Sequence, residues 1–178
     1  MFLKGLQYDV IVADYLLGAV ERYWPHGADG MMNRLLNATK PGGYLLITSL
    51  EPYENILDRK NNKDKLVLNV ESIGEAAAYI AGESTYREVP LSWILRQIDR
   101  FPEYQIVTTK EFPMTLTSRS LLNQISYARA TLKKIEDTIL QTAFLKRVAA
   151  LEKDIKKKWK SSTHMGTNNA IIVQRGYV

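Results

Sequence analysis

The sequence contains no cysteine and only two histidines, and these absences limit the chemistry that it can support. Without thiols the chain forms neither disulfide bonds nor thiolate metal sites. His26 and His164 lie far apart, with no acidic residue at a matching spacing, so we expect no metal site. No stretch approaches the roughly 20 apolar residues of a membrane-spanning helix. The sequence thus gives no sign of a disulfide framework, a metal centre or a membrane span.

The sequence also shows no evident secretory signal peptide, because residues 1–6 lead directly into a predicted apolar strand. The sequence does not determine the cellular compartment of the protein. The cytoplasm is the default expectation, and an organelle is possible if an N-terminal signal is missing. At 178 residues, with 46% hydrophobic and 24% charged residues, the chain has the size and composition of one ordinary globular domain.

The interpretation of the net charge of +5 depends on where the basic residues lie. Residues 59–65 mix them with Asn and Asp, which is typical of a solvated loop. Residues 153–160 end a helical pattern, where the helix dipole favours cations. An anionic partner is the alternative interpretation of the second stretch. Nucleic acid is the less favoured partner, because aromatic residues are not interleaved with the lysines.

Two apolar runs separated by a turn define the first part of the chain. Residues 9–14 (Asp-Val-Ile-Val-Ala-Asp) predict a strand buried on both faces of a parallel sheet. Residues 40–43 (Lys-Pro-Gly-Gly) predict a tight turn, and residues 44–49 a second strand. Between the two strands we expect a loop through Gly18 and Trp24 and then a helix at 30–38. The result is a right-handed βαβ unit.

That first helix is predicted from its cap and its apolar spacing. Asp29 is placed to cap it, and Met32, Leu35 and Leu36 share one face. The remaining predicted elements follow in chain order: an exposed loop at 54–65, helices at 72–80 (capped by Ser72) and 90–100, and strands at 104–110 and 169–174.

A helical stretch from about 118 to 160 carries a coiled-coil-like apolar seam. Its first phase comprises Leu121, Ile125, Ala128, Leu132, Ile135 and Ile139, and its second Leu145, Val148, Leu151 or Glu152, Ile155 and Trp159. The change of phase predicts two helices with a bend near Asp137. Either this hairpin packs on its own domain, or the seam is an interface with another copy or a partner.

The segments 8–18 (YDVIVADYLLG) and 36–43 (LNATKPGG) resemble class I S-adenosylmethionine-dependent methyltransferases from their fourth strand onward. The resemblance covers residues 8–112 and 168–176. It implies an α/β fold: a partial Rossmann-like sheet that ends in an antiparallel hairpin, with a helical hairpin inserted before the last strand. Residues 1–178 would then form the C-terminal part of one methyltransferase-like domain, with the insertion at about 118–160.

The resemblance also implies a site. Ligands of open α/β sheets bind beyond the carboxyl ends of the strands, and in this family the acid and aromatic after the fourth strand lie beside the transferable methyl group. A general base is needed only if the methyl acceptor carries a proton. The candidate residues are Asp14, Tyr15 and Glu51 for catalysis, Asp14, Tyr15 and Leu16 for S-adenosylmethionine, and Tyr53, His26 and Arg87 for the substrate.

The family's glycine-rich cofactor loop and ribose-binding acid have no counterpart in this sequence. In the family's strand order, 3-2-1-4-5-7-6, the strand at 9–14 would be an open central edge if the chain is complete, and such an edge is a template for aggregation. Two interpretations remain open. The chain is the C-terminal portion of an enzyme that methylates a small molecule and is inactive alone, or it is a degenerate methyltransferase-like structural subunit of a larger assembly.

Overall fold

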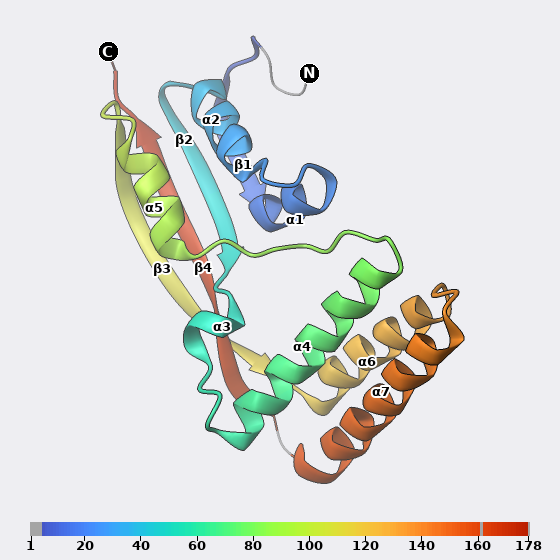
Figure 1. Ribbon diagram of the computed structural model, residues 1–178. Helices are drawn as coiled ribbons and strands as arrows, with labels where there is room; N and C mark the ends of the chain where they lie inside the picture. The colour runs from blue at the N-terminus through green and yellow to red at the C-terminus, as the bar shows by residue number, and fades with distance from the viewer. Residues whose placement is uncertain (1–4, 161, 178) are drawn as a thin grey trace. The chain divides into compact units, whose positions relative to one another are not determined.

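The computed structural model describes residues 5–160 and 162–177 (Figure 1), so the first four residues of the segment examined for a signal peptide lie outside it. Its elements in chain order are β1 (Tyr8–Asp14), α1 (Leu16–Tyr23), α2 (Ala28–Ala38), β2 (Thr39–Leu50), α3 (Tyr53–Ile56), α4 (Asn62–Ile80), α5 (Leu91–Asp99), β3 (Tyr104–Leu116), α6 (Ser118–Leu132), α7 (Thr138–Lys158) and β4 (Thr163–Arg175). No helix of the described residues combines the length and apolarity needed to cross a membrane.

The chain divides into two compact units. The first, called the sheet unit below, comprises residues 1–52, 86–113 and 167–178. The second, the helical unit, comprises residues 53–85 and 114–166. The predicted insertion at 118–160 supplies α6 and α7 to the helical unit, and α4 supplies its third long helix.

The sheet has the order β1-β2-β4-β3. β1 pairs with β2 in parallel, from Val10 opposite Tyr44 to Asp14 opposite Thr48, and β2 pairs with β4 in antiparallel. The arrows of β3 and β4 run in opposite directions in Figure 1. The predicted mixed α/β sheet with a final antiparallel hairpin is therefore confirmed.

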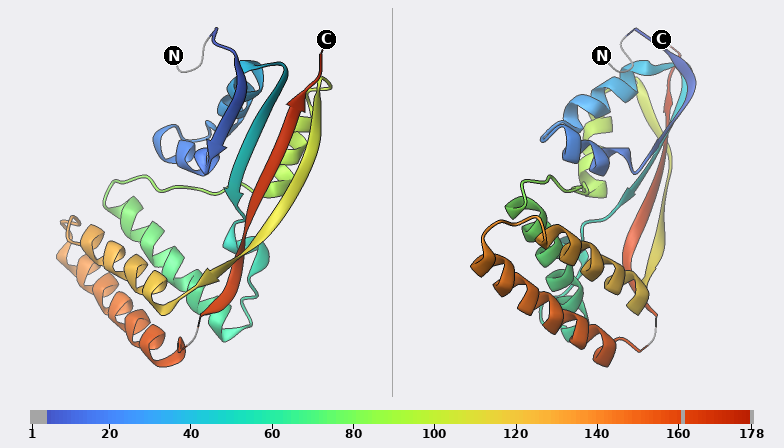
Figure 2. Two further views of the ribbon diagram at one scale, coloured as in Figure 1. Left: turned by 180° about the vertical axis from the view of Figure 1, so that it is seen from behind. Right: turned by 90° about the vertical axis from the view of Figure 1, so that its right-hand side faces the viewer.

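One face of the sheet unit is covered by α1, α2 and α5, as the right-hand view of Figure 2 shows. The core on this face contains Ala13, Leu17, Val20, Met32, Leu35, Leu36, Leu45, Ile47, Ile94, Ile98, Ile171 and Val173. On the other face Val10 and Val12 are 62% and 60% exposed, and Tyr44 and Val107 are also exposed. The prediction that β1 is buried on both faces is wrong for the described chain, because none of its elements packs on the outer face.

Three local predictions in the sheet unit also need correction. The predicted loop after β1 is the helix α1, which buries Leu17 and Val20 on one side. Gly27, rather than Asp29, is the N-cap of α2. The Lys-Pro-Gly-Gly segment lies within β2, where the pairing register with β1 shifts and Gly42 has a φ of 79°. Only glycine adopts that backbone without strain.

The helical unit encloses its own apolar core between α4, α6 and α7. Asp137 caps α7 by accepting hydrogen bonds from two backbone N–H groups, so the predicted bend is confirmed at that residue. The seam residues of both phases are buried, apart from Leu145, which is partly buried against the core, and Ile139, which is 82% exposed and was wrongly assigned to the seam. In place of the predicted 54–65 loop lie α3 and the start of α4, whose N-cap is Asn61 rather than Ser72.

Candidate functional site

The carboxyl ends of β1 and β2 are joined by a network of polar side chains. The Thr48 hydroxyl donates to the Asp14 carboxylate over 2.6 Å and accepts from the backbone N–H of Tyr15 at 3.0 Å. The Tyr15 hydroxyl reaches the side-chain oxygen of Asn168 on β4 at 2.9 Å. This network therefore fixes Asp14 and Tyr15 at the strand edge where open α/β sheets bind ligands.

Tyr15 holds a backbone conformation that tyrosine rarely adopts. Its φ and ψ are 46° and 23°, in the left-handed region, and it forms the junction between β1 and α1. Such a conformation persists only where surrounding contacts hold it, and it is enriched at functional sites. Here the contacts to Thr48 and Asn168 supply that support, and the half-exposed ring stays accessible to a ligand.

Near the same edge lies the half-buried carboxylate of Glu88, which was not among the residues predicted from the sequence. It accepts a hydrogen bond from the backbone of Leu50, and a Cβ added to Gly18 of α1 would lie 2.6 Å from its Oε2. That oxygen is buried and has no hydrogen-bond partner among the described residues. Burial raises the pKa of Glu88, and the Leu50 hydrogen bond opposes the rise. The one sequence signal was its position beside Arg87, immediately before Val89 and Pro90.

Glu51 follows β2 directly and points to the start of α5. Its Oε2 accepts from the backbone N–H of Leu91 at 2.8 Å. Carboxylates at helix N-termini satisfy free N–H groups and are stabilised by the helix dipole. Glu51, a candidate general base according to the family resemblance, thus caps the N-terminus of α5 in the structure.

The remaining predicted site residues occupy different surroundings. Leu16 opens α1 and packs against the core of the sheet unit. His26 lies exposed in the turn between α1 and α2 with a φ of 62°, and Arg87 is exposed, its backbone N–H bonded to the oxygen of Gly18. Tyr53 belongs to the helical unit, where it is 6% exposed within the apolar core. Asp14, Tyr15, Glu51 and Arg87 thus share the sheet unit, while Tyr53 does not.

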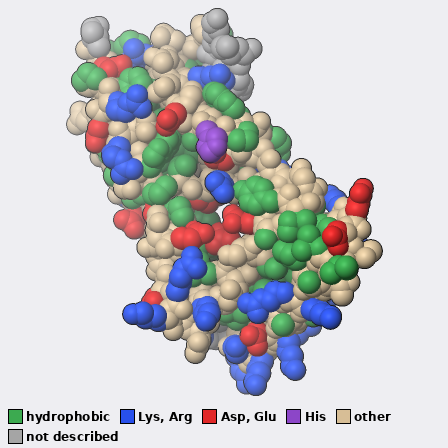
Figure 3. All heavy atoms as spheres, in the orientation of Figure 1, with side chains coloured by type: hydrophobic (Ala, Val, Ile, Leu, Met, Phe, Trp, Pro, Cys, Tyr) green, Lys and Arg blue, Asp and Glu red, His purple; other side chains and the backbone are tan. Residues whose placement is uncertain are grey.

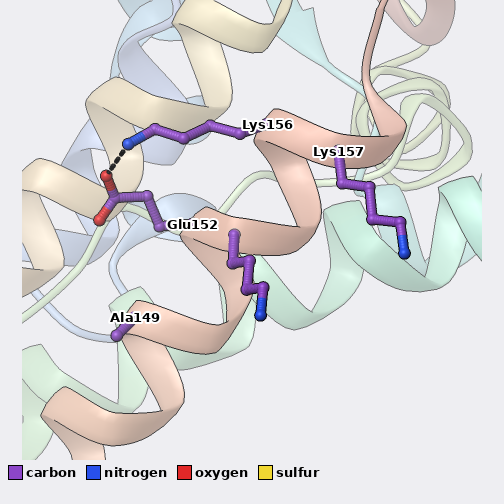
Figure 4. Close-up of a pocket in the computed structure, with 5 residues that line it drawn as sticks. Ala149, Glu152, Lys156 and Lys157 are labelled. Atoms are coloured by element: carbon purple, nitrogen blue, oxygen red, sulfur yellow. Dashed lines mark hydrogen bonds and ion pairs between the residues drawn. The ribbon is translucent and has the colours of Figure 1, made fainter.

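Two lysines at the lysine-rich end of α7 are paired with acids of the same helix. Lys156 and Lys158 pair with Glu152 and Asp154 one turn earlier, and Arg129 of α6 also pairs with Glu152. An open hollow here is lined by Ala149, Glu152, Lys153, Lys156 and Lys157, and Figure 4 shows Lys156 reaching back to Glu152. Figure 3 shows basic side chains at this end of the helical unit. The pairing favours the interpretation as a solvated helix end.

Comparison with solved structures shows the fold. A methyltransferase candidate from Bacillus halodurans C-125 has a TM-score of 0.50 at 12% identity, over 97% of this chain and 65% of that chain. The YcgJ protein from Bacillus subtilis gives the same four values. The chain has the fold of part of a class I methyltransferase. No family model and no curated protein matches the sequence.

A loganic acid methyltransferase, solved with SAH (S-adenosylhomocysteine), has a TM-score of 0.49 at 10% identity, over 96% of this chain and 62% of that chain. The chain spans 65% or less of each of these three proteins. At 12% identity the two Bacillus structures show the fold alone, and activity and substrate are matters for proposal.

Asp14 and Tyr15 at the carboxyl end of β1, called the rim below, have the chemistry to lie beside the sulfonium of S-adenosylmethionine. Its sulfur carries a positive charge, for which a carboxylate and an aromatic face are favourable neighbours. Asp14 offers the first and the exposed ring of Tyr15 the second. Among the described residues no group of three or more His, Asp or Glu side chains is arranged to hold a metal ion.

Proposed function

We propose that this chain is the C-terminal portion of an S-adenosylmethionine-dependent methyltransferase domain that methylates a small molecule. One observation carries the proposal: the Asp14–Thr48–Tyr15–Asn168 network lies at the ligand-binding edge of a sheet with the methyltransferase fold. S-adenosylmethionine supplies a methyl group on a positively charged sulfur, and the protein accelerates its transfer chiefly by positioning the acceptor.

The chain's own residues would divide the work as follows. Asp14, oriented by Thr48, balances the positive charge of the cofactor, while Tyr15 and Leu16 contact its apolar surface. Where the acceptor carries a proton, Asp14 or Glu51 accepts it. His26 and Arg87 contact the acceptor. Tyr53 has the least support as a substrate residue, because its ring is used in the helical core.

A second candidate function rests on the uncovered face of the sheet. Val10 and Val12 are exposed on β1, which is paired on one side only among the described residues. A structural subunit that docks this face and edge on another polypeptide would explain both features. In the enzyme interpretation the same surface is covered by the segment that carries the cofactor loop, so the chain alone binds S-adenosylmethionine weakly or not at all.

Intact mass of the native protein, followed by calorimetric titration with S-adenosylmethionine, separates the two functions. A mass well above 20.3 kDa with binding in the micromolar range supports the enzyme. A mass of 20.3 kDa without binding, even in the presence of a copurifying protein, rejects it in favour of the structural subunit.

A matched pair of substitutions tests the role of the rim in the binding-competent form. Asp14→Asn keeps the acceptor oxygen for Thr48 but removes the charge, and we expect the affinity for S-adenosylmethionine to fall about 10-fold. Asp9→Asn removes a carboxylate from the other end of β1, where it pairs with Lys40, and should leave the affinity unchanged. Equal affinities for both variants would refute the role of Asp14.

A further inference from the structure

Arg22 in the last turn of α1 lies within cation–π distance of two aromatic rings. Its guanidinium carbon lies 5.8 Å from the centroid of the Tyr23 ring and 5.3 Å from that of Tyr86. Both rings are exposed, Tyr23 to 76% and Tyr86 to 51%. Stacking on aromatic faces fixes the plane of a guanidinium and leaves its N–H groups pointing outward along the ring edges.

The segment that carries Tyr86 is anchored to α1. The backbone N–H of Arg87 donates to the oxygen of Gly18 at 3.2 Å, and the Glu88 carboxylate lies against the same glycine. Gly18 and Arg22 are four residues apart on one helix and therefore share a face. The second ring over Arg22 is thus positioned by backbone contacts rather than by the exposed tyrosine itself.

No carboxylate neutralises Arg22 within the described ranges 5–160 and 162–177. The neighbouring Glu21 accepts from the backbone N–H groups of His26 and Ala28, and Glu88 turns toward Leu50 and Gly18. A guanidinium that is oriented but unpaired matches a planar oxyanion, which it binds through two parallel hydrogen bonds. The exposed tyrosine rings beside it offer contact to an apolar group.

We propose that Arg22, with Tyr23 and Tyr86, binds the carboxylate or phosphate of a ligand whose remaining part is apolar. Arg22 lies six positions after Leu16, the first residue of α1, which corresponds to about 9 Å along a helix. If the proposed methyl transfer is correct, the acceptor carries its anionic group at about this distance from the methylated atom. This last step alone rests on the proposed function; binding of the anion does not.

The test is a titration of the purified full chain, with any copurifying polypeptide, followed by NMR or calorimetry. Benzoate and phenyl phosphate are the probes, benzamide is the uncharged control, and the preferred anion distinguishes a carboxylate ligand from a phosphate ligand. Arg22→Gln should weaken the better probe about 10-fold, and Arg22→Lys less, because lysine keeps the charge without the planar fork. Benzamide should bind more weakly than either anion.

Arg34→Gln is the matched control, because Arg34 stacks on the single ring of Trp24, 4.7 Å from its centroid. It should retain the affinity of the unmodified chain. The proposal is overturned if Arg22→Gln and Arg34→Gln weaken binding equally, if Arg22→Gln changes nothing, or if benzamide binds as tightly as benzoate. Since no cofactor enters the titration, failure to bind S-adenosylmethionine would reject the proposed function and leave this result unaffected.

Discussion

The helical unit and the sheet unit bury their apolar side chains in different ways. In the helical unit α4, α6 and α7 surround a shared core, and nearly every residue of the predicted seam is buried there. In the sheet unit one face is packed by helices and the other exposes Val10 and Val12. The helical unit buries its apolar side chains within itself, whereas the sheet unit leaves the apolar side chains of one sheet face exposed.

The largest expected effect tests the self-contained core of the helical unit. Leu121 is fully buried between the helices, so Leu121→Ala should lower the free energy of unfolding by about 2–5 kcal/mol. Chemical denaturation followed by circular dichroism measures the change.

Ile139 provides the control for this substitution, because it belongs to the same sequence pattern but is exposed. Ile139→Ala should change stability by less than about 0.5 kcal/mol. A comparable loss in both variants would mean that the seam is buried against something other than α4 and that the core has been misassigned.

An intermediate effect concerns the uncovered face of the sheet. Val12 lies next to Val10 on this face, and burying one valine in a contact is worth about 1.5 kcal/mol or more. We expect the isolated chain to self-associate or precipitate, and Val12→Lys to increase the monomer fraction in sedimentation experiments. Val107→Lys, on β3, should help less, because Val107 is flanked on its face by Gln105 and Thr109.

This prediction has a clear contrary outcome. A monodisperse, cooperatively melting monomer of the unmodified chain would show that the exposed valines need no cover. The sheet unit would then be as self-contained as the helical unit.

A smaller effect is expected from the half-buried carboxylate of the sheet unit. Because burial raises the pKa of Glu88, the folded chain holds this proton more tightly than the unfolded chain. Stability should therefore fall as pH rises from the usual glutamate value of 4.5 through the raised pKa. Glu88→Gln removes this loss of stability. The denaturation midpoint of the variant should therefore be higher than that of the unmodified chain at neutral pH, and the two midpoints should become equal below pH 4.5.

Glu152 of the helical unit should change stability with pH in the opposite direction to Glu88, and by the smallest amount. The hydrogen bond from Lys156, followed by Arg129, holds its pKa below the usual value. Its contribution is therefore present at neutral pH and lost as pH falls below 4.5 through the lowered pKa. Glu152→Gln should slightly destabilise the chain at neutral pH, since exposed pairs contribute little. The same direction of change for both glutamine variants would contradict this assignment.

Sequence reasoning succeeded where a local pattern determines the structure. The change of seam phase placed the bend at Asp137, whose side chain caps α7, because helix caps act over two or three residues. It failed at Ile139, since periodicity alone does not show where a helix begins to leave its neighbour. It also missed α1, where Gly18 is accommodated by close packing against Glu88 rather than by helix propensity.

Only those residues of the candidate site that lie next to each other in the sequence could be predicted. Asp14 and Tyr15 could be placed because the ends of parallel strands form the ligand-binding edge. Their partners could not, because Thr48 is 34 residues from Asp14 and Asn168 is 153 residues from Tyr15. Side chains brought together over such separations depend on strand order and register, which no single segment encodes.

The two ends of β1 differ in the side-chain contacts that hold them to the sheet. Its carboxyl end is tied to β2 and β4 by the Thr48 and Asn168 hydrogen bonds, while its amino end has the solvent-exposed pair of Asp9 and Lys40. Edge strands fray from the end that opens at the lowest free energy. We therefore expect local opening of β1 to begin at Tyr8 and proceed toward Ala13, while Asp14 stays hydrogen-bonded to Thr48.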